Sequence, residues 1–216
     1  MTETRIPSEQ AGSESPSDTD PLADIYDCDL ERFGADPRAV HWKSAEVQNQ
    51  NFEILSSIAP LNEATILDVG CGMADLLAFL RDRGFTGRYF GWDFSAGMVT
   101  RCRERFPDAT FVRTDIYANM PEAEVDYALI SGTLNDRVEG EIGAVFNLLR
   151  SVYARCRKGM AFNLLSSYVD YQEAGLLYCD PSDVLAFCKR ELSRYVSLRH
   201  DYARFQFSTF VYRRDA

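Results

Sequence analysis

The sequence predicts an α/β fold in which a mostly parallel β-sheet ends in one antiparallel strand. Within residues 65–80 a short apolar run, a glycine turn and a helical pattern follow one another, which indicates a strand, a turn and a helix. Strand and helix patterns then alternate to the C-terminus, as in a doubly wound parallel sheet. Only residues 200–204 separate the last two strands, and a parallel return needs about a dozen residues or more, so this pair must form an antiparallel hairpin.

Each predicted element rests on a local pattern. The strands are short apolar runs, expected at 65–69, 87–92, 109–113, 125–131, 159–165, 195–199 and 205–212. The helices carry apolar side chains at helical spacing and are expected at 22–32, 44–59, 73–83, 95–106, 139–156 and 181–189. Ser44 and Ser95 are typical N-caps, and Pro181 is a typical residue for a helix start.

Length and composition fit one globular domain. The chain has 216 residues, of which 46% are hydrophobic, enough to bury a substantial core. Half of the net charge of −10 lies in the first 24 residues, which hold six acids and one base. Residues 1–21 are therefore expected to form a disordered acidic tail or, alternatively, an interaction segment. The domain would span 22–216, with a helical cap at 22–60 and an α/β core at 61–216.

Composition disfavours several kinds of partner. No apolar run reaches the length of about 20 residues that a membrane span needs, and the N-terminus lacks an apolar signal core. A cytoplasmic protein without membrane contact is therefore expected. No basic stripe is present to neutralise phosphates, so no nucleic-acid partner is expected. Six scattered cysteines and two histidines, without a ligand cluster, predict no metal site, and the oligomeric state stays open.

The glycine turn and the acid that follows the second strand indicate a nucleotide site. Gly70 and Gly72 allow a sharp turn and a close approach of a ligand to the backbone. Asp93 lies 21 positions after Gly72, where an acidic side chain binds ribose hydroxyls in such folds. Asp75 replaces the third glycine of the dinucleotide fingerprint, and no Tyr-x-x-x-Lys pair is evident. An NAD(P)-dependent oxidoreductase on a Rossmann fold is kept as an alternative.

Four segments resemble, in order, the motifs of class I S-adenosylmethionine-dependent methyltransferases: LDVGCGMADLL at 67–77, GWDFSAGM at 91–98, FVRTDI at 111–116 and VDYALISG at 125–132. The resemblance covers about residues 41–212. It implies a Rossmann-like, seven-stranded class I methyltransferase sheet with an antiparallel last strand and an N-terminal helical cap. It also implies methyl transfer from S-adenosylmethionine, with S-adenosylhomocysteine as product and no metal.

Two later segments indicate a particular group within this methyltransferase family. FNLLSSY at 162–168 and HDY at 200–202 are similar to segments in a group of bacterial small-molecule methyltransferases. The implied acceptor is therefore a small molecule. The loop after the fourth strand lacks the paired prolines of enzymes that methylate nucleobase amines, which argues against such acceptors. A module that binds the cofactor without transferring its methyl group is kept as a second alternative.

The resemblance assigns the methionine end of the cofactor to the glycine turn. Gly70, Cys71 and Gly72 would place backbone against the methionine and ribose parts, and Asp68 would lie near the methionine amino group. Ser131 would close the pocket beside the methionine tail, with simple packing as the alternative.

The resemblance assigns the adenosine end to the next two motifs. Asp93 would accept hydrogen bonds from both ribose hydroxyls, since a carboxylate has two oxygens suited to a diol. Its alternative role is a charge at a helix N-terminus. Phe94 and Met98 would pack on the adenine faces. Asp115 would accept from the adenine amino group and Ile116 would donate its backbone N–H, although Asp115 could also be purely structural.

The acceptor side carries weaker signals. Trp42 of the helical cap is expected to touch the cofactor or to serve only in packing. The acceptor residues are expected near the carboxyl ends of the strands and on the cap, where ligands of open α/β sheets bind. They are Tyr26, Asn135, Ser167, Tyr168 and Tyr202.

His200 is the candidate general base, because a neutral imidazole is available near pH 7. The alternative is a turn histidine that bonds to Asp201 or is exposed. A base is not always required, because the methyl group of a sulfonium is already activated. The enzyme must chiefly align the acceptor and exclude water.

Overall fold

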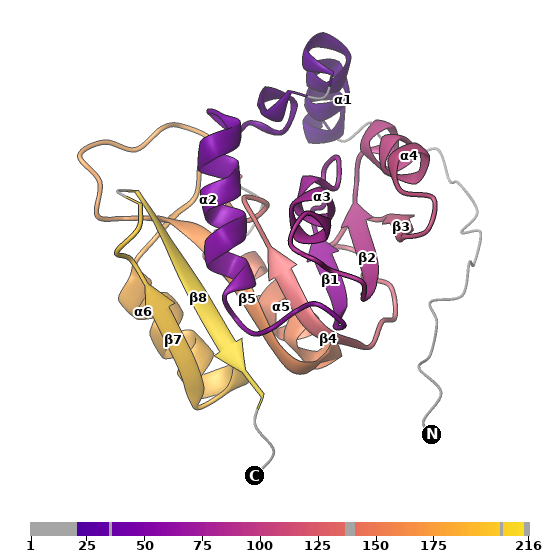
Figure 1. Ribbon diagram of the computed structural model, residues 1–216. Coiled ribbons are helices and arrows are strands. Elements are labelled where there is room, and N and C mark those ends of the chain that lie inside the picture. Colours follow the sequence, from indigo (N-terminus) through magenta and orange to yellow (C-terminus); the bar gives the residue numbers. More distant parts are fainter. Residues whose placement is uncertain (1–20, 35, 137–140, 204, 214–216) are drawn as a thin grey trace.

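The sheet of the computed structural model, which describes residues 21–34, 36–136, 141–203 and 205–213, confirms the predicted fold class. Its strands are β1 Thr65–Val69, β2 Arg88–Asp93, β3 Thr110–Arg113, β4 Val125–Ile130, β5 Cys156–Ser166, β6 Tyr178–Cys179, β7 Tyr195–Arg199 and β8 Gln206–Tyr212. They form an eight-stranded sheet in the order β3-β2-β1-β4-β5-β8-β7, with β6 paired to β5 (Figure 1). β8 is antiparallel to both neighbours, as predicted from the short connection before it, and the other pairs are parallel.

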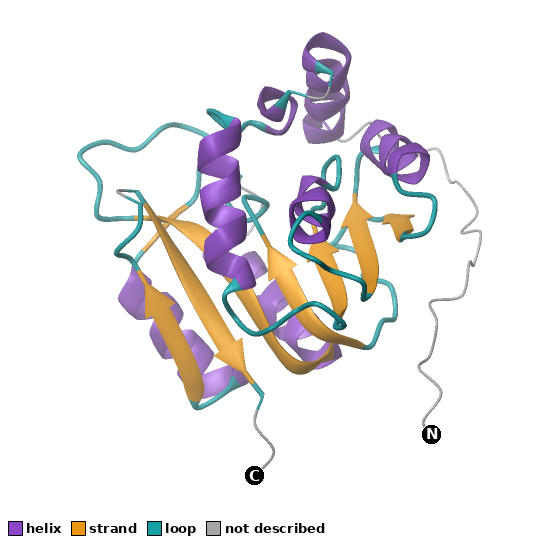
Figure 2. Ribbon diagram, viewed as in Figure 1, coloured by secondary structure: helices purple, strands orange, loops and turns teal. Residues whose placement is uncertain are grey.

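Helices cover both faces of the sheet (Figure 2). They are α1 Pro21–Phe33, α2 Ala45–Ser56, α3 Asp75–Arg81, α4 Ala96–Arg105, α5 Glu141–Arg155 and α6 Pro181–Phe187, with a 3₁₀ turn η1 Pro37–Val40 and a π turn η2 Cys188–Leu192. In β1, Leu67 packs in a core with α5 and α6, whereas its neighbour Ile66 packs in a core with α2, α3 and α4. Successive side chains of a strand point to opposite faces, so the central strands are apolar on both sides.

Differences from the predicted elements are local. β6, of two residues, was not predicted, and β5 begins at Cys156 rather than 159. The helix expected at 73–83 begins at Asp75 because Ala74 has a left-handed φ of +57°. The predicted tail, 1–21, lies outside the described residues except for Pro21, the first residue of α1. None of the described helices combines the length and apolar composition needed to cross a membrane.

The N-terminal segment lies against the carboxyl end of the sheet. α2 packs on α3, β5 and β8, and α1 packs on η1 and α4. Asn163 of β5 links α2 to the loop after β4: its Nδ2 donates to Asn51 Oδ1 at 2.9 Å, and its Oδ1 accepts from the backbone N–H of Gly132 at 2.8 Å. Asn51 and Asn163 are both buried. Ligands of open α/β sheets bind at this edge. The hydrogen bonds of Asn163 therefore hold α2 beside the candidate site.

Candidate active site

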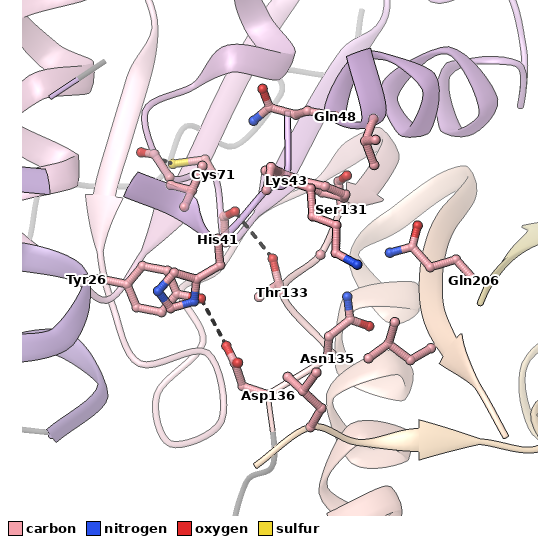
Figure 3. Close-up of a pocket in the computed structure, with 18 of the residues that line it drawn as sticks. Tyr26, His41, Lys43, Gln48, Cys71, Ser131, Thr133, Asn135, Asp136 and Gln206 are labelled. Atoms are coloured by element: carbon pink, nitrogen blue, oxygen red, sulfur yellow. Dashed lines mark hydrogen bonds between the residues drawn. The ribbon is translucent and has the colours of Figure 1, made fainter. Parts of the chain in front are cut away.

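A cavity of about 1330 Å³ lies at the carboxyl ends of the central strands. It is lined by the loops that follow β1, β2, β3 and β4, by the segment from η1 into α2, and by the start of β8. Figure 3 shows side chains from the loops after β1 and β4, from the segment between η1 and α2, and from the start of β8 directed into one space. Small-molecule pockets usually measure about 300–1,000 Å³, so this cavity can hold a nucleotide cofactor together with a second small molecule.

The turn after β1 requires glycine. Gly70 and Gly72 have φ angles of +73° and +51°, which strain most other residues. A Cβ atom at Gly70 would lie 2.1 Å from Oγ1 of Thr133, whose hydroxyl donates to the carbonyl of Val69 at 2.9 Å. Gly70, Cys71 and Gly72 all line the cavity. A ligand can therefore approach the backbone of this turn closely.

Asp93 ends β2 as a buried carboxylate in the cavity lining. Its Oδ2 accepts from the backbone N–H of Gly72 at 2.8 Å and its Oδ1 from that of Ser95 at 3.0 Å. Burial raises the pKa of Asp93 to about 6, although the backbone donors of Ser95, Gly72 and Phe94 oppose the rise. Each oxygen keeps a further lone pair, so the carboxylate can still accept from a vicinal diol such as ribose.

Asp68 lies in β1 beneath the glycine turn and also lines the cavity. It is buried and accepts a hydrogen bond from the hydroxyl of Tyr89. Burial, together with the nearby charges of Asp93 and Asp75, raises the pKa of Asp68 to about 7, although the hydrogen bond from Tyr89 opposes the rise. An adjacent cation would favour the charged form of both carboxylates, so this end of the cavity suits a positively charged ligand.

The residues predicted for adenine line another part of the same cavity. Phe94, Met98 and Ile116 contribute apolar surface there, and Met98 and Ile116 are buried. Asp115 Oδ1 accepts from the backbone N–H of Tyr117 at 2.8 Å. Its second carboxylate oxygen can accept from another donor. Apolar faces next to a carboxylate suit the ring and amino group of a purine.

Tyr26 connects α1 to the loop after β4. Its hydroxyl donates to Asp136 Oδ2 at 3.0 Å, and its ring stacks on His41 with centroids 4.5 Å apart (Figure 3). The ring also meets Phe94 edge-on at 5.6 Å. Burial, followed by the charge of Asp136, raises the pKa of the Tyr26 hydroxyl, which therefore stays a donor. His41 Nε2 lies 3.0 Å from Asp29 Oδ2, so α1 is held to the cavity rim from two sides.

The loop after β4 brings two unpartnered polar atoms to the cavity. Ser131 Oγ and Asn135 Oδ1 are hidden from solvent, and neither has a hydrogen-bond partner among the described residues. Gly132 between them has a φ of +82°, and a Cβ atom there would lie 3.0 Å from the ring of Trp42. Buried polar atoms are normally paired, so Ser131 and Asn135 mark places where a ligand can make hydrogen bonds.

The cavity brings together most of the residues singled out in the sequence. The eleven residues predicted for the cofactor line it: Trp42, Asp68, Gly70, Cys71, Gly72, Asp93, Phe94, Met98, Asp115, Ile116 and Ser131. Three residues predicted for the acceptor, Tyr26, Asn135 and Tyr202, line it as well. Their individual contacts with a ligand stay predictions.

His200, Ser167 and Tyr168 lie outside this lining. The His200 ring meets Phe207 edge-on at 6.0 Å and Tyr168 at 6.5 Å. Phe207 belongs to the core on the α5 and α6 side, whereas its neighbour Gln206 lines the cavity. Side chains alternate between the faces of a strand, so the hairpin lies at the expected edge while the imidazole packs on the other face. The role of His200 as a base stays a prediction.

The polar residues of the lining that sequence reasoning missed include His41, Lys43, Asp136 and Gln206. His41 and Lys43 come from the connection between η1 and α2, and Gln206 is the first residue of β8. Only Asp136 has a sequence signal for a place in the site, because it closely follows the fourth methyltransferase-like segment. The others converge only because the N-terminal segment packs on the sheet edge next to β8.

Comparison with known proteins agrees with this geometry. Residues 66–155 match the family model described as a methyltransferase domain. The chain is 36% identical over 159 residues to a putative methyltransferase, Rv1506c of Mycobacterium tuberculosis, a match that covers 68% of this chain and 92% of the relative. It is 32% identical over 91 residues to trans-aconitate 2-methyltransferase of Escherichia coli, covering 42% of this chain and 36% of that enzyme.

A solved structure shows the same fold. Magnesium protoporphyrin IX methyltransferase (ChlM) from Synechocystis, crystallised with bound S-adenosylhomocysteine, superposes with a TM-score of 0.61 at 12% identity. The superposition covers 78% of this chain and 83% of that chain. Three observations agree: the ordered motifs, the sheet with one antiparallel strand, and the relative matched over most of its length. The chain therefore belongs to the class I S-adenosylmethionine-dependent methyltransferases.

Proposed function

We propose that this methyltransferase binds S-adenosylmethionine along the ends of β1 to β4 and methylates a small molecule held beside β4, β5 and β8. The observation that carries the proposal is Asp93, whose buried carboxylate joins the glycine turn to the next helix and faces the cavity. One relative and one protein of similar fold are named for small-molecule substrates, trans-aconitate and magnesium protoporphyrin IX, which supports a small-molecule acceptor.

The charges of the lining suit the cofactor. Among the described residues, six with carboxylate side chains line the cavity, namely Asp68, Asp75, Asp93, Asp115, Asp136 and Glu173. S-adenosylmethionine carries a sulfonium and an ammonium against one carboxylate, so it is a net cation. Buried carboxylates such as Asp68 and Asp93 gain from a nearby positive charge, because it lowers the cost of holding their own charge away from water.

Each part of the proposed cofactor site has a distinct task. Asp93 would accept from the ribose hydroxyls and Asp115 from the adenine amino group. The bare backbone at Gly70 and Gly72 would contact the methionine part, and the unpartnered Ser131 Oγ would hydrogen-bond to its polar end. When bound, S-adenosylmethionine supplies an activated methyl group, and loss of that group leaves neutral S-adenosylhomocysteine.

The chain itself then has to align the acceptor and exclude water. Tyr26, Trp42 and α2 would cover the cavity, and holding two reactants in line is the largest contribution that such a site can make. An acceptor atom that carries a proton must also release it. Asp136 would be one candidate to receive that proton, because it lines the cavity and Tyr26 occupies only its Oδ2. His200 remains the sequence-based candidate for the same step.

The test combines binding and turnover. Isothermal titration should give saturable binding of S-adenosylmethionine and S-adenosylhomocysteine but not of NADH. Incubation of the protein with labelled S-adenosylmethionine and a panel of small molecules should yield labelled methyl product together with S-adenosylhomocysteine. Failure to bind either sulfur compound would refute the proposed cofactor site, and binding without product from any small molecule would refute the proposed acceptor class.

A further inference from the structure

We propose that Lys43, Asn135 and Gln206 form a carboxylate-binding subsite in the acceptor part of the cavity, so that the methyl acceptor is an organic acid. This inference rests on the proposed function and specifies its acceptor. The subsite would recognise and position the acceptor, whichever of its atoms receives the methyl group. It is argued from the placement, charge and hydrogen-bonding capacity of the three side chains.

The three residues come from three different parts of the fold. Lys43 lies between η1 and α2, Asn135 in the loop after β4, and Gln206 at the start of β8. All three line the cavity, and Figure 3 shows the Lys43 ammonium and the two side-chain amides directed toward one another. β8 lies on the opposite side of β4 from β2, which carries Asp93. The subsite therefore lies away from the end assigned to adenosine.

Lys43 is the one Lys or Arg side chain among the described residues that line the cavity. The ion pairs of the described residues do not include Lys43, so no carboxylate of that part of the chain neutralises it. The lining also holds Asp136, which accepts from Tyr26 through Oδ2, and Glu173. Neither acid forms an ion pair with Lys43, which is an exposed side chain at the cavity. A lysine directed into an otherwise acidic site without a partner is suited to an anionic group of the ligand.

The amides supply the rest of the recognition. The NH₂ groups of Asn135 and Gln206 are donors, and the ammonium of Lys43 has three N–H bonds, so the three side chains can surround both oxygens of one carboxylate. The unpartnered Asn135 Oδ1 calls for a donor, such as a hydroxyl or amine next to that carboxylate. The set contains a single lysine and no arginine, which fits one singly charged carboxylate better than a doubly charged phosphate group.

The test uses protein saturated with S-adenosylhomocysteine and matched probe pairs. Benzoate and succinate are titrated calorimetrically against benzamide and succinamide, with phenylphosphonate as a phosphate-like probe. The acids should bind and the amides should not. Lys43→Met should weaken acid binding about fivefold or more, because it removes an ion pair and a charge-assisted hydrogen bond to the acid. Lys43→Arg should restore most of the acid binding.

Lys189→Met is the matched control. Lys189 lies in η2, donates to the carbonyl of Arg194 at 3.3 Å and is not part of the cavity lining. Its loss changes the net charge of the protein as much as Lys43→Met, so acid binding should stay at the wild-type value. A salt titration adds a second readout, because wild-type acid binding should weaken with ionic strength more steeply than that of Lys43→Met.

Three outcomes would overturn the subsite: equal acid binding by wild type and Lys43→Met, amides that bind as well as acids, or no saturable binding of any acid by the wild type. Tighter binding of phenylphosphonate than of benzoate would replace the carboxylate by a phosphate group and so also refute the proposal. The same titrations measure S-adenosylhomocysteine affinity. If that affinity is present while acids are not recognised, the subsite fails and the proposed function stands; if it is absent, the proposed function fails first.

Discussion

Asp93→Asn tests the cofactor site most directly, because it keeps the shape of the side chain and removes its charge. In the wild type the two carboxylate oxygens accept from Gly72 and Ser95, and their remaining lone pairs are available to ribose. A hydrogen bond to a charged group contributes about 1.5–3 kcal/mol. The amide keeps one neutral acceptor, so a loss of about 1.5–3 kcal/mol is expected, or a roughly tenfold to hundredfold rise in the dissociation constant of S-adenosylmethionine.

The same substitution should change the folding free energy of the ligand-free protein very little. The folded pKa of Asp93 is about 6, above the ordinary value of 3.8, so the folded state holds the proton more tightly than the unfolded state does. Stability from this group is present below pH 3.8 and is lost as the pH rises through about 6. Above that pH the buried charge costs up to about 3 kcal/mol, which the amide relieves.

The loss of a backbone hydrogen bond nearly cancels the stability that the amide gains by removing the buried charge. Asn has one acceptor oxygen for the two backbone donors of Gly72 and Ser95, and a buried donor left without a partner costs about 1–3 kcal/mol. The melting temperature of the ligand-free variant should therefore stay within a few degrees of the wild type. Asp108→Asn, which breaks a surface ion pair with Arg81 outside the cavity, is the matched control.

Thermal shift and titration calorimetry measure both effects. At a ligand concentration of about 100 times the wild-type dissociation constant, the ligand stabilises the wild type by about 2.7 kcal/mol. A hundredfold weaker variant would keep only about 0.4 kcal/mol under the same conditions. Wild-type affinity should fall as the pH drops through about 6, because protonation removes the charged acceptor, and the variant should lack this inflection. Wild-type affinity in Asp93→Asn, or an unchanged inflection, would refute the reasoning.

Three further substitutions probe the glycine turn, the link to α2 and the hairpin. Gly70→Ala should destabilise the protein and abolish cofactor binding, because its Cβ would overlap Thr133. Gly34→Ala is the control, since Gly34 has a similar positive φ with open space around it. A denaturation curve should show that Gly34→Ala lowers the free energy of unfolding by only about 1–2 kcal/mol, the cost of the left-handed conformation. Asn163→Leu should lower the free energy of unfolding by about 2–4 kcal/mol, since two buried hydrogen bonds are lost, and calorimetry should show weaker cofactor binding. His200→Ala tests the sequence-based candidate for the base. Because the His200 ring lies outside the cavity lining, turnover per folded molecule should stay near the wild-type value, and a loss of about 10²–10⁴ with intact cofactor affinity would instead assign the base to His200.

The sequence by itself determined the fold and most of the residues that line the cavity beside the glycine turn, because both depend on neighbouring residues. The turn at Gly70, the N-cap at Ser95 and the acid at Asp93 belong to one short strand–turn–helix unit and the strand after it. The short connection before β8 forces the antiparallel pairing whatever the rest of the chain does. Motifs at successive strand ends then meet at one edge, since parallel strands share a carboxyl end.

Only the tertiary structure decided which polar side chains face the acceptor part of the cavity. His200 and Gln206 lie a few residues apart in the same hairpin, yet Gln206 lines the cavity and His200 packs on Phe207. Lys43 reaches the same space from a segment more than a hundred residues away in the sequence. Their convergence depends on the position of β8 between β5 and β7 and on α2 packing across the sheet. Those long-range contacts bring together residues that are far apart in the sequence, and no local sequence pattern indicates that they meet.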